Sequence, residues 1–209
     1  MSSATALNNW ELLADEAALE QTAKALQANG FNVVVAENGE EAKRAVLDLI
    51  PPGSEVFTGR SATLTSLGLD TEIDQSGHYQ SLRSRLNGLN RETQRDEMRR
   101  IGAAPAYAIG SVHAITRKGE VLIASYGGSQ LAPYVSGAGK VIWVVGTQKL
   151  VDTLDDGFQR IEEHSLPLES ERLQKALGVP SAAAKILIYR QEPIANRITI
   201  VLVKEKLRY

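Results

Sequence analysis

The feature that most constrains the fold is a continuous apolar run from Lys140 to Gly146 (KVIWVVG). A strand without polar alternation needs cover on both faces, which is typical of a parallel sheet with helices on either side. Further β-branched runs stand at 31–36 (FNVVVA), 185–189 (KILIY) and 197–203 (RITIVLV), and segments with helical spacing separate several of them. This alternation predicts an α/β fold with a mostly parallel, open sheet and flanking helices.

Helical segments are marked by the residues at their ends. We expect a first helix over 10–29, beginning after Asn8 and Asn9, because asparagine is a common N-terminal cap. A second helix is expected over 38–50, where two prolines stop it. A third is expected from about 148 to 163, directly after the long apolar run.

Two segments depart from simple strand and helix alternation. Residues 70–102 are charged, poor in strand formers and helical in their second half, and we interpret them as an excursion from one domain spanning 1–209. The stretch 107–126 carries two β-rich segments around the turn RKGE, which is typical of an antiparallel hairpin. The last two strands, 185–189 and 197–203, are predicted to be neighbours because only a short segment that contains QEPIAN separates them.

Composition and charge exclude several classes of function. A formal net charge of -2 leaves no basic field for nucleic acid, whose binding depends on phosphate neutralisation. The chain has no cysteine, which excludes a disulfide framework, a thiolate nucleophile and a Cys-ligated zinc or iron–sulfur site. No signal peptide is evident, and no apolar run approaches the roughly 18 residues of a membrane span. We therefore expect a cytoplasmic protein with no membrane contact.

A glycine and hydroxyl-rich loop between a strand and a helix is the first candidate binding element. It contains Gly59, Arg60, Ser61 and Thr63. Free backbone N–H groups at a helix start favour phosphate or carboxylate, and an arginine adds positive charge. The structural alternative is equally consistent, with Ser61 capping the helix and Gly59 making the turn. The loop lacks the endings of a Walker A or dinucleotide-binding motif.

A second loop, SYGGSQLAPY, again follows a strand. Its candidate ligand-binding residues are Gly127, Gly128, Ser129 and Gln130, although Ser129 could instead cap a helix. If both loops leave the same edge of one sheet, they would grip opposite ends of one small anionic ligand. Lys149, after the long apolar strand, is placed where it could also meet an anion, although such a lysine is more often solvated.

The stretch GSVHAIT places Ser111 and His113 on one face of a strand. Ser111 is a candidate ligand contact, and His113 could act as a general base. A half-buried histidine satisfied by the backbone is the interpretation that we favour. His78 and His164 show no metal-ligand spacing with His113, so no metal site is predicted.

In their order along the chain, three segments resemble the LUD (lactate utilisation, LutC/YkgG-like) family of bacterial proteins. They are GRSATLTSLGL at 59–69, GSVHAIT through LESER at 110–172, and KILIY through KEKL at 185–207. Two departures stand out. This chain lacks the cysteine-rich insertion that some relatives carry after the position of PLESERL, and Arg208 stands where the family commonly has glycine.

The resemblance implies a fold similar to the NagB/RpiA/CoA-transferase group, whose members hold phosphorylated or carboxylated ligands in loops at strand ends. It implies an accessory subunit in bacterial L-lactate utilisation, with an iron–sulfur subunit and a second LUD subunit as partners. Whether the chain forms a homo-oligomer is left open, and no cofactor is identified. The alternative is an isomerase or an acyl/CoA transferase of this fold, using His113 or Glu120 as acid/base or nucleophile. Whether the chain is an enzyme is left undecided by the sequence.

Overall fold

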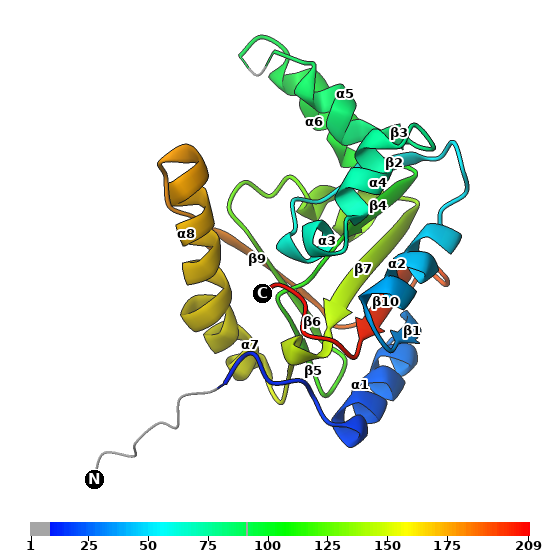
Figure 1. Cartoon of the computed structure of the whole chain (residues 1–209), viewed down its shortest axis with the longest axis vertical. Coiled ribbons are helices and arrows are strands. Elements are labelled where there is room, and N and C mark those ends of the chain that lie inside the picture. The colour runs from blue at the N-terminus through cyan, green and yellow to red at the C-terminus, as the bar shows by residue number, and fades with distance from the viewer. Residues whose placement is uncertain (1–8, 91) are drawn as a thin grey trace.

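The computed structural model describes residues 9–90 and 92–209 and has two sheets (Figure 1). The strands are β1 Asn32–Ala36, β2 Glu55–Thr58, β3 Gln80–Ser81, β4 Tyr107–Gly110, β5 Ala114–Thr116, β6 Val121–Ser125, β7 Lys140–Gly146, β8 Leu150–Val151, β9 Lys185–Tyr189 and β10 Ile198–Val203. Six of them form a sheet in the order β1-β10-β7-β4-β2-β3, and all of its pairings are parallel. The predicted fold class, a mostly parallel open sheet in an α/β protein, is confirmed.

The centre of the large sheet is the apolar run that dominates the sequence. Strand β7 pairs with β10 on one side and β4 on the other, and its residues from Val141 to Gly146 are all buried. Strand β10 is buried along its whole length. Two adjacent strands without polar alternation require apolar cover on both faces, which the helices and the second sheet provide.

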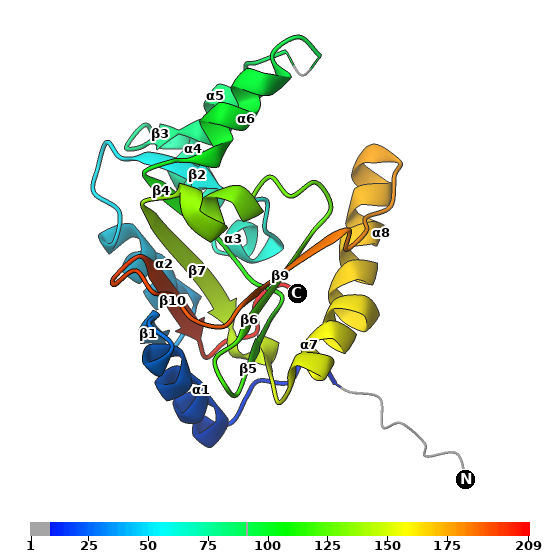
Figure 2. The same cartoon turned by 180° about the vertical axis from the view of Figure 1, so that it is seen from behind.

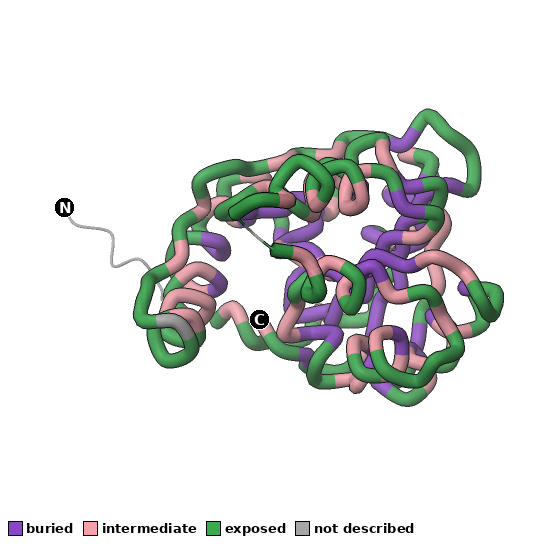
Figure 3. Tube along the Cα trace, turned by 90° about the horizontal axis from the view of Figure 1, so that it is seen from above, coloured by how far each residue is buried: buried purple, intermediate pink, exposed green. Residues whose placement is uncertain are grey.

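Helices and short helical turns surround the sheets. They are α1 Glu16–Ala28, α2 Gly39–Asp48, α3 Ala62–Ser66, α4 Leu69–Gln75, α5 Leu82–Asn87, α6 Arg95–Ala103, η1 Pro133–Gly137, η2 Thr147–Lys149, α7 Leu154–Arg160, η3 Ile161–Ser165 and α8 Leu166–Leu177. Helices α2, α3 and α4 cover one face of the large sheet, where Val46, Leu64 and Ile73 pack against Val144 and Val201. Buried residues gather in the sheets and on the helix faces that cover them (Figure 3).

The second sheet lies on the opposite face of the large one. Its strand order is β8-β5-β6-β9, and Ile115 and Ile123 share a core with Trp143 of β7 and Leu26 of α1. Its outer face is covered by the helical segment that contains Ile161, which packs with Ala114 and Leu122. Figure 2 shows β9 crossing toward α8, which stands apart from the sheets. The molecule is therefore layered as helices, parallel sheet, small sheet and helices.

The charged excursion forms a projecting helical hairpin made of α5 and α6 (Figure 1). Helix α6 has no buried residue. The segment is mainly helical, as the sequence predicts, but it also contributes Gln80 and Ser81 as a short strand that pairs with β2 at the sheet edge.

Three local predictions are wrong, each for a physical reason. The first helix begins after Asp15, whose carboxylate accepts the Ala18 N–H at 2.7 Å; Asn8 lies outside the described residues. Strand β9 pairs with β6 whereas β10 lies between β1 and β7, so the last two strands are not neighbours. In the 107–126 stretch only β5 and β6 form the hairpin. The first expected strand is divided, because β4 ends at Gly110 and pairs within the parallel sheet.

The expected helix at 148–163 is also replaced by shorter elements. Residues Thr147–Lys149 form one tight turn and Leu150–Val151 a short strand of the second sheet. The helix starts only at Leu154, after Thr153 caps it by accepting the Asp156 N–H. Pairing of β8 with β5 supplies hydrogen bonds that a helix would otherwise provide.

Candidate functional site

The carboxyl ends of four adjacent parallel strands bring separate segments together. Strands β2, β4, β7 and β10 are neighbours, and they end at Thr58, Gly110, Gly146 and Val203. The loops that follow them start with 59–63, Ser111, 147–149 and 204–209. This edge of an open parallel sheet is where ligands normally bind in such folds.

Lys149 lies at the centre of this edge with its side chain buried, at 1% exposure. Its ammonium group donates to Thr63 Oγ1 at 2.9 Å, to Ser111 Oγ at 3.0 Å and to the Val112 carbonyl at 3.2 Å. The structure thus brings three of the predicted ligand contacts, Thr63, Ser111 and Lys149, into direct contact. The sequence alone favoured an exposed lysine at position 149, but the structure buries this side chain.

The charge of Lys149 is not balanced by a carboxylate. None of the ion pairs formed in the part of the chain that the structure describes involves Lys149. Burial, and then the charge of Arg160, hold the pKa of Lys149 well below its usual range. Burial disfavours an ammonium group that has no carboxylate partner, and a bound anion would favour its charged form.

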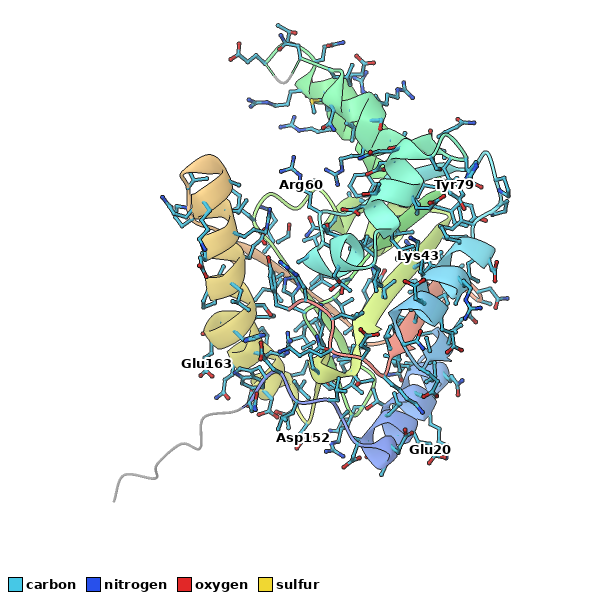
Figure 4. All side chains as sticks on the ribbon, viewed as in Figure 1. Glu20, Lys43, Arg60, Tyr79, Asp152 and Glu163 are labelled. Atoms are coloured by element: carbon cyan, nitrogen blue, oxygen red, sulfur yellow. The ribbon has the colours of Figure 1, made fainter. Side chains whose placement is uncertain are left out.

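The other members of the first loop have mainly structural contacts. Ser61 caps α3 by accepting the Leu64 N–H at 3.4 Å, and Gly59 donates its N–H to the Ile109 carbonyl at 2.8 Å. A Cβ on Gly59 would lie 2.8 Å from the Tyr134 hydroxyl, so this position requires close approach of the backbone. Arg60 is exposed and extends outward beside α3 (Figure 4). Of the loop, only Thr63 reaches Lys149.

The second loop leaves a different sheet. It follows β6, whereas the first loop follows β2 of the large sheet, so the condition that both loops leave one edge is not met. Its polar groups serve the loop itself: Gly128 N–H donates to Ser125 Oγ, and Ser125 Oγ donates to Gln130 Oε1, both at 2.9 Å. Gly127 and Ser129 are exposed.

His113 directly precedes β5, and Glu120 lies in the turn between β5 and β6. His113 Nδ1 accepts the Ala124 N–H at 3.1 Å, which leaves the ring proton on Nε2. Burial, with the charges of Lys149 and Arg160, lowers the pKa of His113 to about 3. Glu120 accepts from Thr116 Oγ1 at 3.2 Å. The two residues therefore have separate partners.

Sequence reasoning missed Arg160, which is fully buried. Its Nη1 donates to the His113 carbonyl at 2.6 Å and to Ser165 Oγ at 3.0 Å, while Nε and Nη2 have no hydrogen-bond partner. A usable signal was present in the sequence. Gly157 packs α7 so closely on β6 that an added Cβ would meet Leu122 at 2.9 Å, and Arg160 follows three residues later on the same helix face.

A cavity of about 290 Å³ adjoins this part of the sheet edge. Its lining residues are Glu11, Gln148, His164, Leu168, Lys206, Leu207, Arg208 and Tyr209. The segment 206–209 is held along this cavity by hydrogen bonds from Gln148 Nε2 to the Leu207 carbonyl and from Thr63 Oγ1 to the Arg208 carbonyl, the latter at 2.8 Å. A larger hollow of about 500 Å³ is formed only by residues 92–97, which include no buried residue. The smaller cavity is therefore the better candidate site.

Residues 9–90 and 92–209 contain neither a cluster of metal-ligating side chains nor a helix suited to span a membrane. No three His, Asp or Glu side chains are grouped closely enough to hold a metal ion. None of the described helices combines the length and apolar character needed to cross a membrane.

Comparison with known proteins places the fold in a family. The family model described as the LUD domain matches residues 19–203. A solved structure described as a DUF162 family protein from Deinococcus radiodurans is similar, with a TM-score of 0.55 and 10% identity, covering 92% of this chain and 99% of that one. At this identity the likeness shows the fold alone. A search of curated proteins gave no match.

Proposed function

Because this chain belongs to the LUD domain family, we propose that it is an accessory subunit of a bacterial L-lactate utilisation system that binds a small carboxylate or a phosphorylated ligand. The binding site is the sheet edge around Lys149, Thr63 and Ser111. Its partners in this proposal are an iron–sulfur subunit and a second LUD subunit, as the resemblance to LutC-like proteins implies.

The observation that supports ligand binding is that the buried amino group of Lys149 has no carboxylate partner. The ammonium group has three oxygen partners, yet none of them is charged. The Ser111 hydroxyl, whose hydrogen bond to the Val112 carbonyl is long at 3.4 Å, can turn to donate to an incoming anion while the lysine supplies charge. An anion at this edge would therefore gain both hydrogen bonds and charge neutralisation.

The environment of His113 supports an accessory role over catalysis. A base must have a free lone pair, but Nδ1 already accepts a backbone N–H and Nε2 carries the proton. Glu120 has Thr116 and the distant guanidinium of Arg190, at 3.9 Å, as its partners. An isomerase or acyl/CoA transferase would need one of these two groups in contact with substrate.

Isothermal titration of the purified chain with L-lactate, pyruvate, inorganic phosphate and coenzyme A tests the binding proposal. We expect heat from at least one of these anions and at least a tenfold loss of affinity in Lys149→Met. Lys24→Met, which removes an exposed lysine on α1, is the matched control and should bind as the unaltered protein does. Absence of heat from all four probes with folded protein would refute ligand binding.

The physiological role needs a separate test. Deletion of the gene in its host should abolish growth on L-lactate as sole carbon source, and the unaltered chain should restore it, whereas Lys149→Met should not. Conversion of an acyl-CoA or a sugar phosphate by the purified chain, lost in His113→Ala or Glu120→Ala, would favour the enzyme alternative.

A further inference from the structure

Two of the arginines in residues 9–90 and 92–209 are buried, and they differ in how their guanidinium groups are hydrogen-bonded. Arg197 pairs with Glu192 at 2.8 Å, in a contact where both side chains are at most 4% exposed. Its remaining hydrogen bonds go to the carbonyls of Ala138, Pro133 and Tyr134 and to the Tyr189 hydroxyl. Arg197 is therefore an example of a buried guanidinium group whose hydrogen bonds are all made within the protein and which has a structural role.

Arg160 is buried more deeply, yet two of its three guanidinium nitrogens have no hydrogen-bond partner. Only Nη1 has partners, and these are a carbonyl and a hydroxyl. It forms no ion pair with any residue in the described ranges. The unpaired atoms, Nε and Nη2, share one edge of the planar group. Two parallel N–H groups on one edge match the two oxygens of a carboxylate.

Arg160 lies beside Lys149, because the two side chains donate to the adjacent carbonyls of His113 and Val112. Burial is the largest cause that lowers the pKa values of Lys149, His113 and His164, and the charge of Arg160 contributes to each of them. His164 lines the 290 Å³ cavity, and it follows Arg160 by four residues, about one helical turn. Gln148, the neighbour of Lys149, lines the same cavity and has a buried Oε1 without a partner.

We propose that the free Nε and Nη2 edge of Arg160 is the anchor for a carboxylate group of the ligand, and that the site selects carboxylates over phosphates. The inference rests on the proposed function, because it names the chemical class of the anion that this sheet edge binds. A planar carboxylate completes the guanidinium edge with two hydrogen bonds, as Glu192 and the backbone carbonyls complete Arg197. A tetrahedral phosphate presents more than two oxygens, and the planar edge of Arg160 can match only two of them.

Titration of Arg160→Lys and of the unaltered chain with pyruvate, L-lactate and inorganic phosphate, at matched ionic strength, tests this assignment. Lysine keeps the charge but has no planar fork. We expect the carboxylate Kd to rise at least tenfold in Arg160→Lys, while any weak phosphate affinity changes less than threefold. Arg190→Lys, an exposed arginine at the end of β9, should leave both unchanged.

The outcomes separate the two proposals. If the unaltered chain binds no anion, both fail. If it binds phosphate but no carboxylate, or if Arg160→Lys binds carboxylate as well as the unaltered chain, anion binding stands and the role of Arg160 is refuted.

A second measurement covers the case in which Arg160→Lys does not fold. Arginine Nε–H resonances of the unaltered chain, followed by NMR during addition of pyruvate, should show one buried arginine that shifts at saturation while Arg197, already bonded, does not. No shift of any buried Nε–H resonance at saturating pyruvate would refute the proposal.

Discussion

Lys149 Nζ lies 2.9 Å from the hydroxyl oxygen of Thr63, although 86 positions separate the two residues in the chain. The same hydroxyl donates to the Arg208 carbonyl at 2.8 Å. One threonine therefore connects the start of α3, the turn after β7 and the segment 206–209 that lines the cavity. Thr63 and Lys149 are both buried, so loss of the hydrogen bond between them would not be readily made good by water.

Thr63→Val should destabilise the protein by about 1–3 kcal/mol, because the isosteric side chain leaves the Arg208 carbonyl without its donor and Lys149 with one acceptor fewer. Urea denaturation measures the change. Thr71→Val on the exposed side of α4 is the matched control and should change the stability by less than about 0.5 kcal/mol. Equal stabilities of the two variants would contradict the linking role of Thr63.

The large sheet could be predicted because the local sequence of its central strands already indicates burial on both faces. The run from Val141 to Val145 is apolar on both faces, and only a doubly covered parallel sheet accepts such a strand. The assignment of strands to sheets could not be predicted, since β9 and β10 have similar composition but lie in different sheets. Pairing between strands far apart in the chain depends on tertiary packing, which the local pattern does not encode.

The candidate site was partly predictable for the same reason. Thr63, Ser111 and Lys149 each follow a strand of the parallel sheet, so the topology rule places them at one edge. Gln130 follows a strand of the second sheet, and the sequence does not distinguish the two cases. Arg160 lies in the middle of a helical segment, where an arginine is usually exposed, and only the neighbouring Gly157 indicates close packing.

Gly110→Ala should destabilise the protein by about 1–3 kcal/mol through overpacking. An added Cβ would lie 1.7 Å from the Tyr134 hydroxyl and 2.9 Å from its ring. The ring cannot move easily, because it is buried and packs edge-on against Trp143 at 5.5 Å. Thermal unfolding should show a lower midpoint for Gly110→Ala and no clear change for Gly127→Ala, where no atom lies within 4 Å of the new methyl.

Arg197→Met should cost about 3–5 kcal/mol, because it leaves the Glu192 carboxylate buried without its partner. Three backbone carbonyls also lose a donor. Arg190→Met removes an exposed arginine and should leave the urea midpoint nearly unchanged. A small effect for Arg197→Met would mean that water reaches Glu192 and that burial of the pair is not maintained in solution.

Acid should destabilise the protein through His113, whose pKa burial and two neighbouring cations lower from 6.5 to about 3. Below pH 6.5 the unfolded chain binds a proton at this position and the folded chain does not, so the free energy of unfolding falls as the pH falls toward 3. From pH 7 to pH 5 the loss is about 2 kcal/mol. His164, whose pKa burial also lowers, adds to the same trend.

His113→Asn isolates this contribution, because an asparagine oxygen can still accept the Ala124 N–H but does not titrate. Urea denaturation at pH 7 and pH 5 should therefore show a smaller loss of stability in His113→Asn than in the unaltered protein. His78→Asn, at an exposed position, should keep the full loss. An identical pH dependence in all three proteins would mean that the folded state accepts the proton on His113, and the neutral, backbone-bonded imidazole described above would then be incorrect.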